Sequence, residues 1–244
     1  MTNFCRGQDD STHEMSPVID CTTEEGLAEG IAAAAEAVRS GLVVVLPTDT
    51  VYGVGVDAFD VGAVAAVLLA KGRGREMPLP VLVPNAQTVD GLAVGVPEYA
   101  NNLIEAFWPG PLTLVLHSQA SLTWDLGESN GTVALRMPQN DTALKLLTEV
   151  GPMAVTSANV SGEPPANTIL DAATQLGSAV SVYLDAGPSS GGLASTILDC
   201  TRDSPTVLRP GGVTADQIRE VLGDVELLNA FDAPSSPTDE QPIE

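Results

Sequence analysis

Hydrophobic and polar positions along the chain alternate with two different periods, and the first patterned segment has the period of a helix. Leu27, Ile31 and Val38 recur at helical intervals, as residues on one buried helix face do. Thr22 precedes them at the spacing of a helix-capping residue, and Gly41 suits the position after the last turn. The pattern therefore predicts a helix between Thr22 and Gly41.

A buried strand is predicted at 42–46, and Asp60 is placed to cap a second helix, which ends where glycines interrupt the segment KGRGR. Further helical patterns lie at 97–107, 141–149, 168–176 and 214–222. Further strand patterns lie at 79–83, 112–117, 132–137, 153–156, 180–184, 195–200 and 205–208. Strands and helices interleave, but the last strands follow one another directly. The expected fold class is therefore α/β (α+β) around a mixed sheet, and not a regular parallel winding.

The chain of 244 residues divides into three predicted parts. Residues 1–16 are expected to form a disordered leader, 17–223 one folded domain, and 224–244 an acidic, disordered tail. The longest strongly apolar run, 61–70, is much shorter than the roughly 20 residues that a membrane-spanning helix needs. The first 15 residues also lack the apolar segment of a secretory signal. We therefore expect a cytoplasmic protein without a membrane partner.

Acidic residues dominate the charge of the chain, with 32 Asp and Glu against 10 Lys and Arg, for a formal net charge of −22. One arginine and three acids give 1–16 a charge of −2, and six acids give 224–244 a charge of −6, which leaves −14 on the predicted domain. A surface this acidic repels phosphate backbones, which disfavours stable nucleic-acid binding. Three scattered cysteines and two histidines argue against a disulfide framework, a zinc site and a Ser-His-Asp triad.

The few basic residues outside the predicted helix surfaces point to a ligand site. Lys71, Arg73 and Arg75 occupy alternate positions after a predicted helix, and Arg136 and Arg209 lie near strand ends. The helix dipole favours a cation at a helix C-terminus, which accounts for Lys71 but not for three cations within five positions. Because the chain has no Walker A sequence, these side chains, and not a backbone loop, would clamp a polyphosphate.

The segment 42–58 places polar groups directly after a buried strand. Thr50 is followed by Gly53 and Gly55, which would permit close approach of the backbone to a ligand. With Ala58 these glycines match the dinucleotide fingerprint G-x-G-x-x-A. They begin several residues after the strand, and no acid ends a second strand at the usual distance, which argues against a Rossmann site. A ligand loop of another kind and a plain structural turn both remain open.

Hydroxyl and amide side chains gather at further strand ends. Thr132 and Arg136 share one face of the strand 132–137, which would line a groove or, alternatively, face solvent at a sheet edge. The strand 153–156 leads into Ser157 and Asn159, and Ser195 opens another strand. Turn chemistry alone would explain Asn159.

Taken in order, seven motifs resemble the YrdC/Sua5 family, the threonylcarbamoyl-AMP synthases. They are P-T-D-T-V-Y-G, K-x-R, W-P-G-P-L-T, R-M-P, S-A-N-x-S-G, S-T and L-R-P-G, and the resemblance covers about residues 24–222 in a short, single-domain form. It implies a YrdC-like twisted mixed β-sheet with flanking helices around a positively charged cavity. It also implies a nucleotidyltransferase that makes threonylcarbamoyl adenylate and pyrophosphate from L-threonine, bicarbonate and ATP for the tRNA modification t6A.

The resemblance further implies roles for individual residues. Thr50, Arg136 and Ser195 would hold threonine, and Lys71 and Arg73 would be the catalytic cations on the phosphates. The ATP-binding set would be Lys71, Arg73, Thr132, Ser157, Asn159 and Arg209. Mg²⁺ would arrive with ATP, without a metal site of the protein's own. Separate t6A transferase proteins would receive the adenylate, and tRNA would not bind stably.

Three positions depart from the family pattern. Met77 and Leu82 stand where longer relatives carry Asn and His, and Pro165 stands where the family has serine, so the contacts of those side chains are not implied here. Two other functions remain as alternatives. One is a carbamoyl-transfer module related to hydrogenase maturation factors, which usually belongs to far larger chains. The other is a non-catalytic RNA-binding protein, which the net charge opposes.

Overall fold

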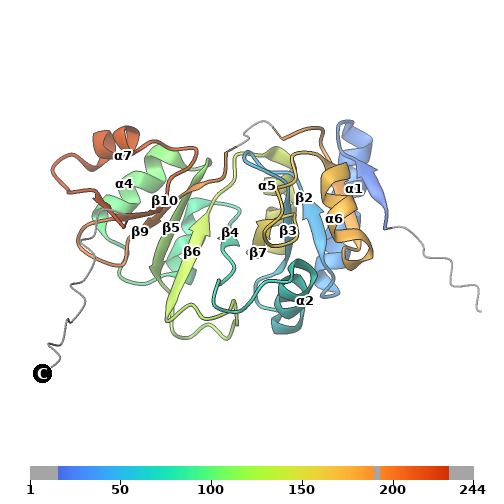
Figure 1. The fold of residues 1–244 in the computed structure, drawn as a ribbon, viewed down its shortest axis with the longest axis horizontal. Coiled ribbons are helices and arrows are strands. Elements are labelled where there is room, and N and C mark those ends of the chain that lie inside the picture. Colours follow the sequence, from blue (N-terminus) through green and yellow to red (C-terminus); the bar gives the residue numbers. More distant parts are fainter. Residues whose placement is uncertain (1–15, 190–192, 231–244) are drawn as a thin grey trace, which may run out of the picture.

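The computed structural model describes residues 16–189 and 193–230, and their strands form one sheet that runs the length of the molecule (Figure 1). The sheet has 11 strands in the order β1-β8-β2-β3-β7-β4-β6-β5-β9-β10-β11. Parallel and antiparallel pairs both occur, because β2 pairs with β8 in parallel and with β3 antiparallel. The α/β fold class with a mixed sheet is therefore confirmed.

The strands are β1 (Val18–Asp20), β2 (Val44–Leu46), β3 (Gly53–Asp57), β4 (Val81–Leu82), β5 (Leu112–His117), β6 (Thr132–Arg136), β7 (Met153–Ser157), β8 (Val182–Asp185), β9 (Thr196–Asp199), β10 (Thr206–Arg209) and β11 (Leu228–Asn229). The helices are α1 (Glu24–Arg39), α2 (Val61–Lys71), α3 (Val89–Leu92), α4 (Glu98–Phe107), α5 (Asp141–Val150), α6 (Ile169–Leu176) and α7 (Ala215–Leu222). Two short 3₁₀ helices span Ala86–Thr88 and Gly177–Ala179.

Two apolar clusters cover the two faces of the sheet, and alternation along β2 shows how the chain supplies both. Val44 and Leu46 belong to the cluster that includes residues of α1 and α5. Val45, between them, belongs to the larger cluster with residues of α2, α4, α6 and α7. Successive strand side chains point to opposite faces, so a run of consecutive apolar residues is what a strand buried on both faces requires.

Strand β3 is the longest of the strands that the sequence did not predict, since the shorter β1 and β11 were also missed. Its glycines, for which a ligand loop and a plain structural turn were both open, form an antiparallel strand between β2 and β7. A Cβ atom on Gly53 or Gly55 would lie 2.7 or 2.6 Å from the Val155 side chain. The glycines therefore make room for Val155 within the sheet, and the rejection of a Rossmann site is confirmed.

Helix ends differ from the prediction by single residues. Thr23, and not Thr22, caps α1, because its hydroxyl accepts a hydrogen bond from the backbone N–H of Gly26. Thr22 instead donates its hydroxyl to Asp20 at 2.6 Å. Gly41 has a φ of 72° after the helix, in the left-handed region, as predicted.

The folded part extends beyond the predicted boundary at 223. Strand β11 pairs in parallel with β10, and the Leu228 N–H donates to the Pro205 carbonyl at 2.9 Å. Val225 and Leu227 pack against the larger apolar cluster, which draws this acidic stretch onto the domain. The rest of the predicted leader and tail, 1–15 and 231–244, lies outside the described residues. Within the part of the chain that is described, no helix is both long and apolar enough to cross a membrane.

Candidate active site

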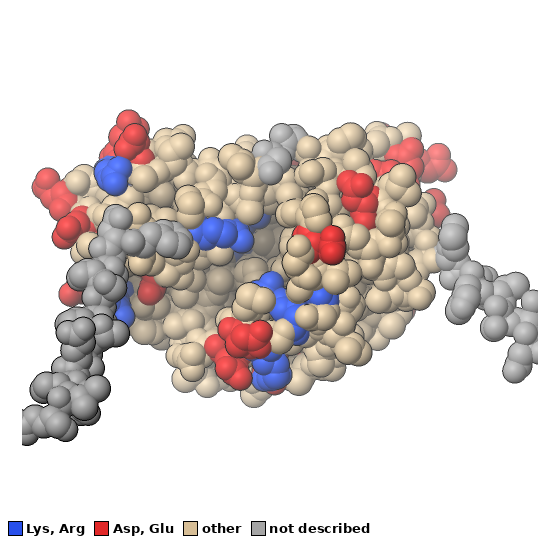
Figure 2. All heavy atoms as spheres, viewed as in Figure 1, with Lys and Arg blue, Asp and Glu red and all other residues tan. Residues whose placement is uncertain are grey.

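A cavity of about 400 Å³ opens on the middle of the sheet. Five adjacent strands, in the order β7-β4-β6-β5-β9, each supply one apolar residue to its lining. These residues are Val155, Leu82, Ala134, Val115 and Ile197. Figure 2 shows the hollow at the centre of the face, with Lys and Arg atoms around it and most acidic residues farther out. The cavity therefore combines an apolar sheet surface with a basic rim.

Three arginines bring positive charge to this cavity from distant parts of the chain: Arg73, Arg136 and Arg209. Burial lowers the pKa of Arg209, and the charges of Arg136 and Arg73 lower it further. Arg209 thus lies within electrostatic reach of the other two guanidinium groups. None of the described residues that line the cavity is acidic. In a chain of net charge −22, so concentrated a positive site is built for an anion.

Arg73 is held at the cavity wall by the turn that follows α2. Gly72 ends the helix in the left-handed region, with a φ of 59°. The Arg73 Nε then donates to the Met77 carbonyl at 2.9 Å, and its Nη1 donates to the Thr156 hydroxyl at 3.1 Å. Burial lowers the pKa of Arg73, while Glu76 opposes the shift. These contacts fix the guanidinium beside the end of β7.

Arg136, the last residue of β6, is almost completely buried at a second wall. Its Nε donates to the Gly110 carbonyl at 3.1 Å, its Nη1 donates to the Thr50 hydroxyl at 3.1 Å, and its Nη2 donates to Asp49. The Thr48 and Thr50 hydroxyls lie 3.0 Å apart. Burial lowers the pKa of Arg136, and the Asp49 carboxylate opposes that shift.

Arg209 and Ser195 form the third wall, where β10 runs beside β9. Arg209 donates from Nε and Nη2 to the Ser195 carbonyl at 3.1 and 2.7 Å, and from Nη2 to the Ser195 hydroxyl at 3.0 Å. The same hydroxyl lies 2.8 Å from that of Thr113 on β5. A Cβ atom on Gly211 would lie 2.3 Å from the Ala194 carbonyl oxygen, so the Pro-Gly-Gly turn lets the two segments pass this closely.

Lys71 and Asn159, both predicted to bind ATP, are buried outside the cavity lining. The Lys71 Nζ donates to the carbonyls of Ser157 and Asn159 at 2.5 Å each, and to the Asn159 Oδ1 at 3.2 Å. Burial, with a smaller contribution from Arg73, lowers the pKa of Lys71 to about 8. Lys71 thus anchors the turn that presents Ser157, and its predicted contact with phosphates stays a prediction.

Two further predicted residues lie away from the cavity. Thr132 begins β6, at the opposite end of the strand from Arg136, and its hydroxyl donates to the Ser129 carbonyl at 2.7 Å. Arg75 is exposed and pairs with Asp125 at 2.6 Å. The cavity therefore brings Arg73 together with Arg136 and Arg209, as the family pattern implied, whereas Lys71 and Arg75 lie outside its described lining.

The departures from the family pattern fall in different places. Leu82 and Pro165 line the cavity, where they add apolar surface. The Met77 side chain is exposed, and only its carbonyl serves the site, as the acceptor for Arg73.

Sequence reasoning missed the roles of Asp49, Thr113 and Thr156. Asp49 and Thr113 do lie in the quoted motifs P-T-D-T and W-P-G-P-L-T. What the sequence does not contain is the adjacency of β5 and β9, which places Thr113 against Ser195.

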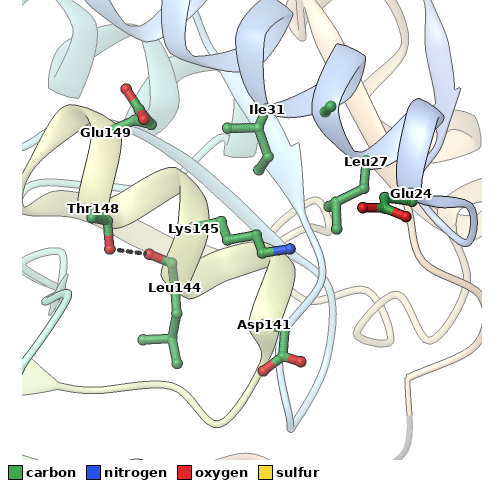
Figure 3. A pocket seen from close by; sticks show the side chains of 9 residues that line it. Glu24, Leu27, Ile31, Asp141, Leu144, Lys145, Thr148 and Glu149 are labelled. Atoms are coloured by element: carbon green, nitrogen blue, oxygen red, sulfur yellow. Dashed lines mark hydrogen bonds between the residues drawn. The ribbon is translucent and has the colours of Figure 1, made fainter.

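A second hollow, of about 550 Å³, lies between α1 and α5. Figure 3 shows Leu27, Ile31 and Leu144 on its walls and the Lys145 side chain extending between Glu24 and Asp141. Its charged groups are mostly carboxylates, which repel phosphate. No group of three or more His, Cys, Asp or Glu side chains suited to a metal occurs among residues 16–189 and 193–230. The basic cavity is therefore the stronger candidate site.

The central cavity of this mixed α/β sheet combines guanidinium groups, hydroxyls and an apolar floor. These features define a class of protein that binds a small anionic ligand through side chains. The family model Sua5/YciO/YrdC, described as telomere recombination, matches residues 36–211. The chain belongs to this family.

Proteins with similar sequences and similar solved structures belong to the same family. A Mycobacterium tuberculosis protein, provisionally named a threonylcarbamoyl-AMP synthase, is 54% identical over 86% of this chain and 96% of its own. The Bacillus subtilis threonylcarbamoyl-AMP synthase is 39% identical over 87% of this chain and 61% of its own. The crystal structure of Pyrococcus abyssi Sua5 complexed with L-threonine matches with a TM-score of 0.82 and 35% identity, over 87% of this chain and 62% of that one. The YrdC-like twisted sheet expected from the motifs is thus confirmed.

Proposed function

We propose that this protein is a threonylcarbamoyl-AMP synthase, which makes threonylcarbamoyl adenylate and pyrophosphate from L-threonine, bicarbonate and ATP for the t6A modification of tRNA. The observation that carries the proposal is the convergence of Arg73, Arg136 and Arg209 on one cavity. Relatives that bear this name align along nearly the whole folded part, and a relative is solved with L-threonine bound.

The reaction needs a site of this kind. The amine of threonine and bicarbonate first give a carbamate and water. A carbamate oxygen then attacks the α-phosphorus of ATP, which forms the acyl–phosphate bond and expels pyrophosphate. Negative charge develops on phosphoryl oxygens, so positioning and fixed cations can supply most of the catalysis without a histidine base.

Threonine would lie at the wall formed by Thr50, Arg136 and Ser195. Three of the five N–H donors of Arg136 are engaged by Gly110, Thr50 and Asp49, which leaves two for a carboxylate. The hydroxyls of Thr50 and Ser195 are further polar partners on the lining. The apolar floor is a surface for the threonine methyl group.

ATP would lie between Arg73 and Arg209, with Ser157 at the turn that Lys71 anchors. The two guanidinium groups would stabilise charge on the phosphates during attack. Magnesium would enter as part of the substrate MgATP, because no carboxylate of the described lining is available to hold it. Thr132, at the other end of β6 and bonded to the Ser129 carbonyl, has no assigned part in this binding.

The product would pass to separate t6A transferase proteins in the cytoplasm. On the face that Figure 2 draws, Lys and Arg atoms gather mainly around the hollow, and a net charge of −22 opposes binding of a tRNA backbone.

Pyrophosphate release tests the proposal. Purified protein is mixed with ATP, Mg²⁺, L-threonine and bicarbonate, and each of the four is omitted in turn. Release should require all of them, and the labile adenylate should be detected by rapid chromatography. Serine should serve less well by about 10- to 200-fold, the effect of one methyl group in an apolar pocket. Pyrophosphate release that is indifferent to threonine would show that the proposed function is wrong.

A further inference from the structure

One carboxylate beside the cavity has no part in the mechanism above. Asp49 lies in the loop between β2 and β3, and its side chain is 10% exposed. Its Oδ2 is the one buried side-chain nitrogen or oxygen atom, within residues 16–189 and 193–230, that lacks a hydrogen-bond partner. A buried carboxylate with an unsatisfied oxygen is costly to a fold, so a structural role alone is a poor explanation for it.

The other oxygen, Oδ1, joins two loops at the threonine wall. It accepts a hydrogen bond from the Arg136 Nη2 and another from the backbone N–H of Gln139, at 3.0 Å. Asp49 thus ties the loop after β2 to the loop after β6, and the guanidinium lies between them. The Arg136 side chain is only 8% exposed, so little water is present to screen its charge from that of Asp49.

The contacts of Arg136 divide its donors into two groups. Gly110, Thr50 and Asp49 each receive one N–H group. A guanidinium is planar and has five N–H groups, so fixing three of them also fixes the direction of the other two. Asp49 is the charged member of the three, and therefore the partner that binds the guanidinium most strongly.

We propose that Asp49 is a positioning residue for the amino-acid substrate: it orients Arg136 so that the two remaining N–H groups meet the substrate carboxylate. This inference rests on the proposed function, because it assigns the carboxylate of threonine to Arg136. Asp49 itself acts through the guanidinium and takes no part in the chemical step.

Asp49→Asn tests the inference, since asparagine keeps the shape of the side chain and removes its charge. The KM for threonine should rise about 10- to 100-fold, the range for loss of a hydrogen bond between charged groups. The KM for ATP should stay close to that of the unmodified protein, because Arg73 and Arg209 do not contact Asp49. The matched control is Asp125→Asn, which breaks the exposed pair with Arg75 and should leave both KM values unchanged.

Threoninamide, which lacks the carboxylate, separates positioning from general disruption. The unmodified protein should bind threonine more tightly than threoninamide, as measured by the rise in melting temperature that each ligand produces. In Asp49→Asn this preference should be lost, whereas general damage would weaken both ligands alike and overturn the inference. If Asp49→Asn does not fold, Asp49→Glu, which keeps the charge but displaces the guanidinium by one methylene, should show the same threonine-specific loss.

Failure of the proposed function and failure of the role of Asp49 give different results. If the unmodified protein releases no threonine-dependent pyrophosphate, the proposed function is wrong. If it does, and Asp49→Asn keeps the threonine KM of the unmodified protein, only the role of Asp49 is wrong.

Discussion

Replacing Arg209 by alanine separates the contribution of a cavity cation to turnover from its contribution to the stability of the fold. Arg209 makes three hydrogen bonds, all to Ser195, and lies within reach of the charges of Arg73 and Arg136. The substitution removes a donor aimed at the proposed phosphate position and also frees Ser195.

The two effects have different sizes. Loss of one donor to developing charge lowers turnover about 10²- to 10³-fold, or about 2.7 to 4 kcal/mol. The Ser195 carbonyl loses its guanidinium partner, which lowers the free energy of unfolding by about 1 to 3 kcal/mol. Arg209 is also repelled by the charges of Arg136 and Arg73, so its removal offsets part of that cost. The rate should therefore fall far more than the melting temperature.

The assay measures pyrophosphate release at saturating threonine and ATP, alongside thermal unfolding of each variant. Arg39→Ala and Arg219→Ala are matched controls, because each arginine makes one exposed ion pair, with Glu149 at 3.5 Å and with Asp216 at 2.8 Å. Exposed pairs contribute about 0 to 1 kcal/mol, so both controls should keep the original rate.

Two results would refute this reasoning. Comparable loss of turnover in Arg39→Ala or Arg219→Ala would mean that the rate follows net charge and not the cavity. A drop in melting temperature large enough to unfold Arg209→Ala at the assay temperature would mean that Arg209 serves the fold.

Four further outcomes are expected. The folded-state pKa of Lys71, about 8, lies below its ordinary 10.5, so the unfolded chain holds the extra proton between these values and Lys71 makes stability rise with pH there. Between pH 8 and 10, the free energy of unfolding measured in urea should rise less with pH, or fall more steeply, for Lys71→Met than for the unmodified protein. Equal pH dependence of the two proteins would contradict the burial of the ammonium group. Thr132→Ala should leave both KM values intact, and a raised KM for ATP would restore its predicted role. Sodium chloride should raise the melting temperature by screening the acidic body, and a fall would show that ion pairs outweigh repulsion. Unmodified tRNA, in the presence of ATP and threonine, should bind no more tightly than about 10⁻⁴ M in filter binding; a micromolar, salt-sensitive complex would revive the RNA-binding alternative.

The sequence predicted elements whose apolar periodicity is strong, and missed those that depend on distant partners. Helix α1 and strands β5 to β7 carry clear patterns and lie close to their predicted places. Strand β3 was missed because Gly53 and Gly55 are required by the side chain of Val155, about a hundred positions away. Strand β11 consists of two residues, too few for any pattern to be recognised.

Site residues, like secondary-structure elements, were predicted where the signal is local and missed where it depends on distant contacts. The motifs identified Arg73, Arg136 and Arg209, which all line the cavity, because strand ends and loops carry few other cations in this chain. The family resemblance implied that Lys71 contacts the phosphates, but the position of a residue in a sequence does not give the direction of its side chain. The ammonium group turns back onto the carbonyls of Ser157 and Asn159.

The strand order determines when during synthesis the site can first exist. Its lining extends from Thr48, in the loop after β2, to Arg209, at the end of β10, and the strands between them are not adjacent in chain order. A nascent chain that has not yet added β10 to the sheet lacks one side of the proposed ATP site. ATP can therefore stabilise the finished domain but cannot guide its early folding.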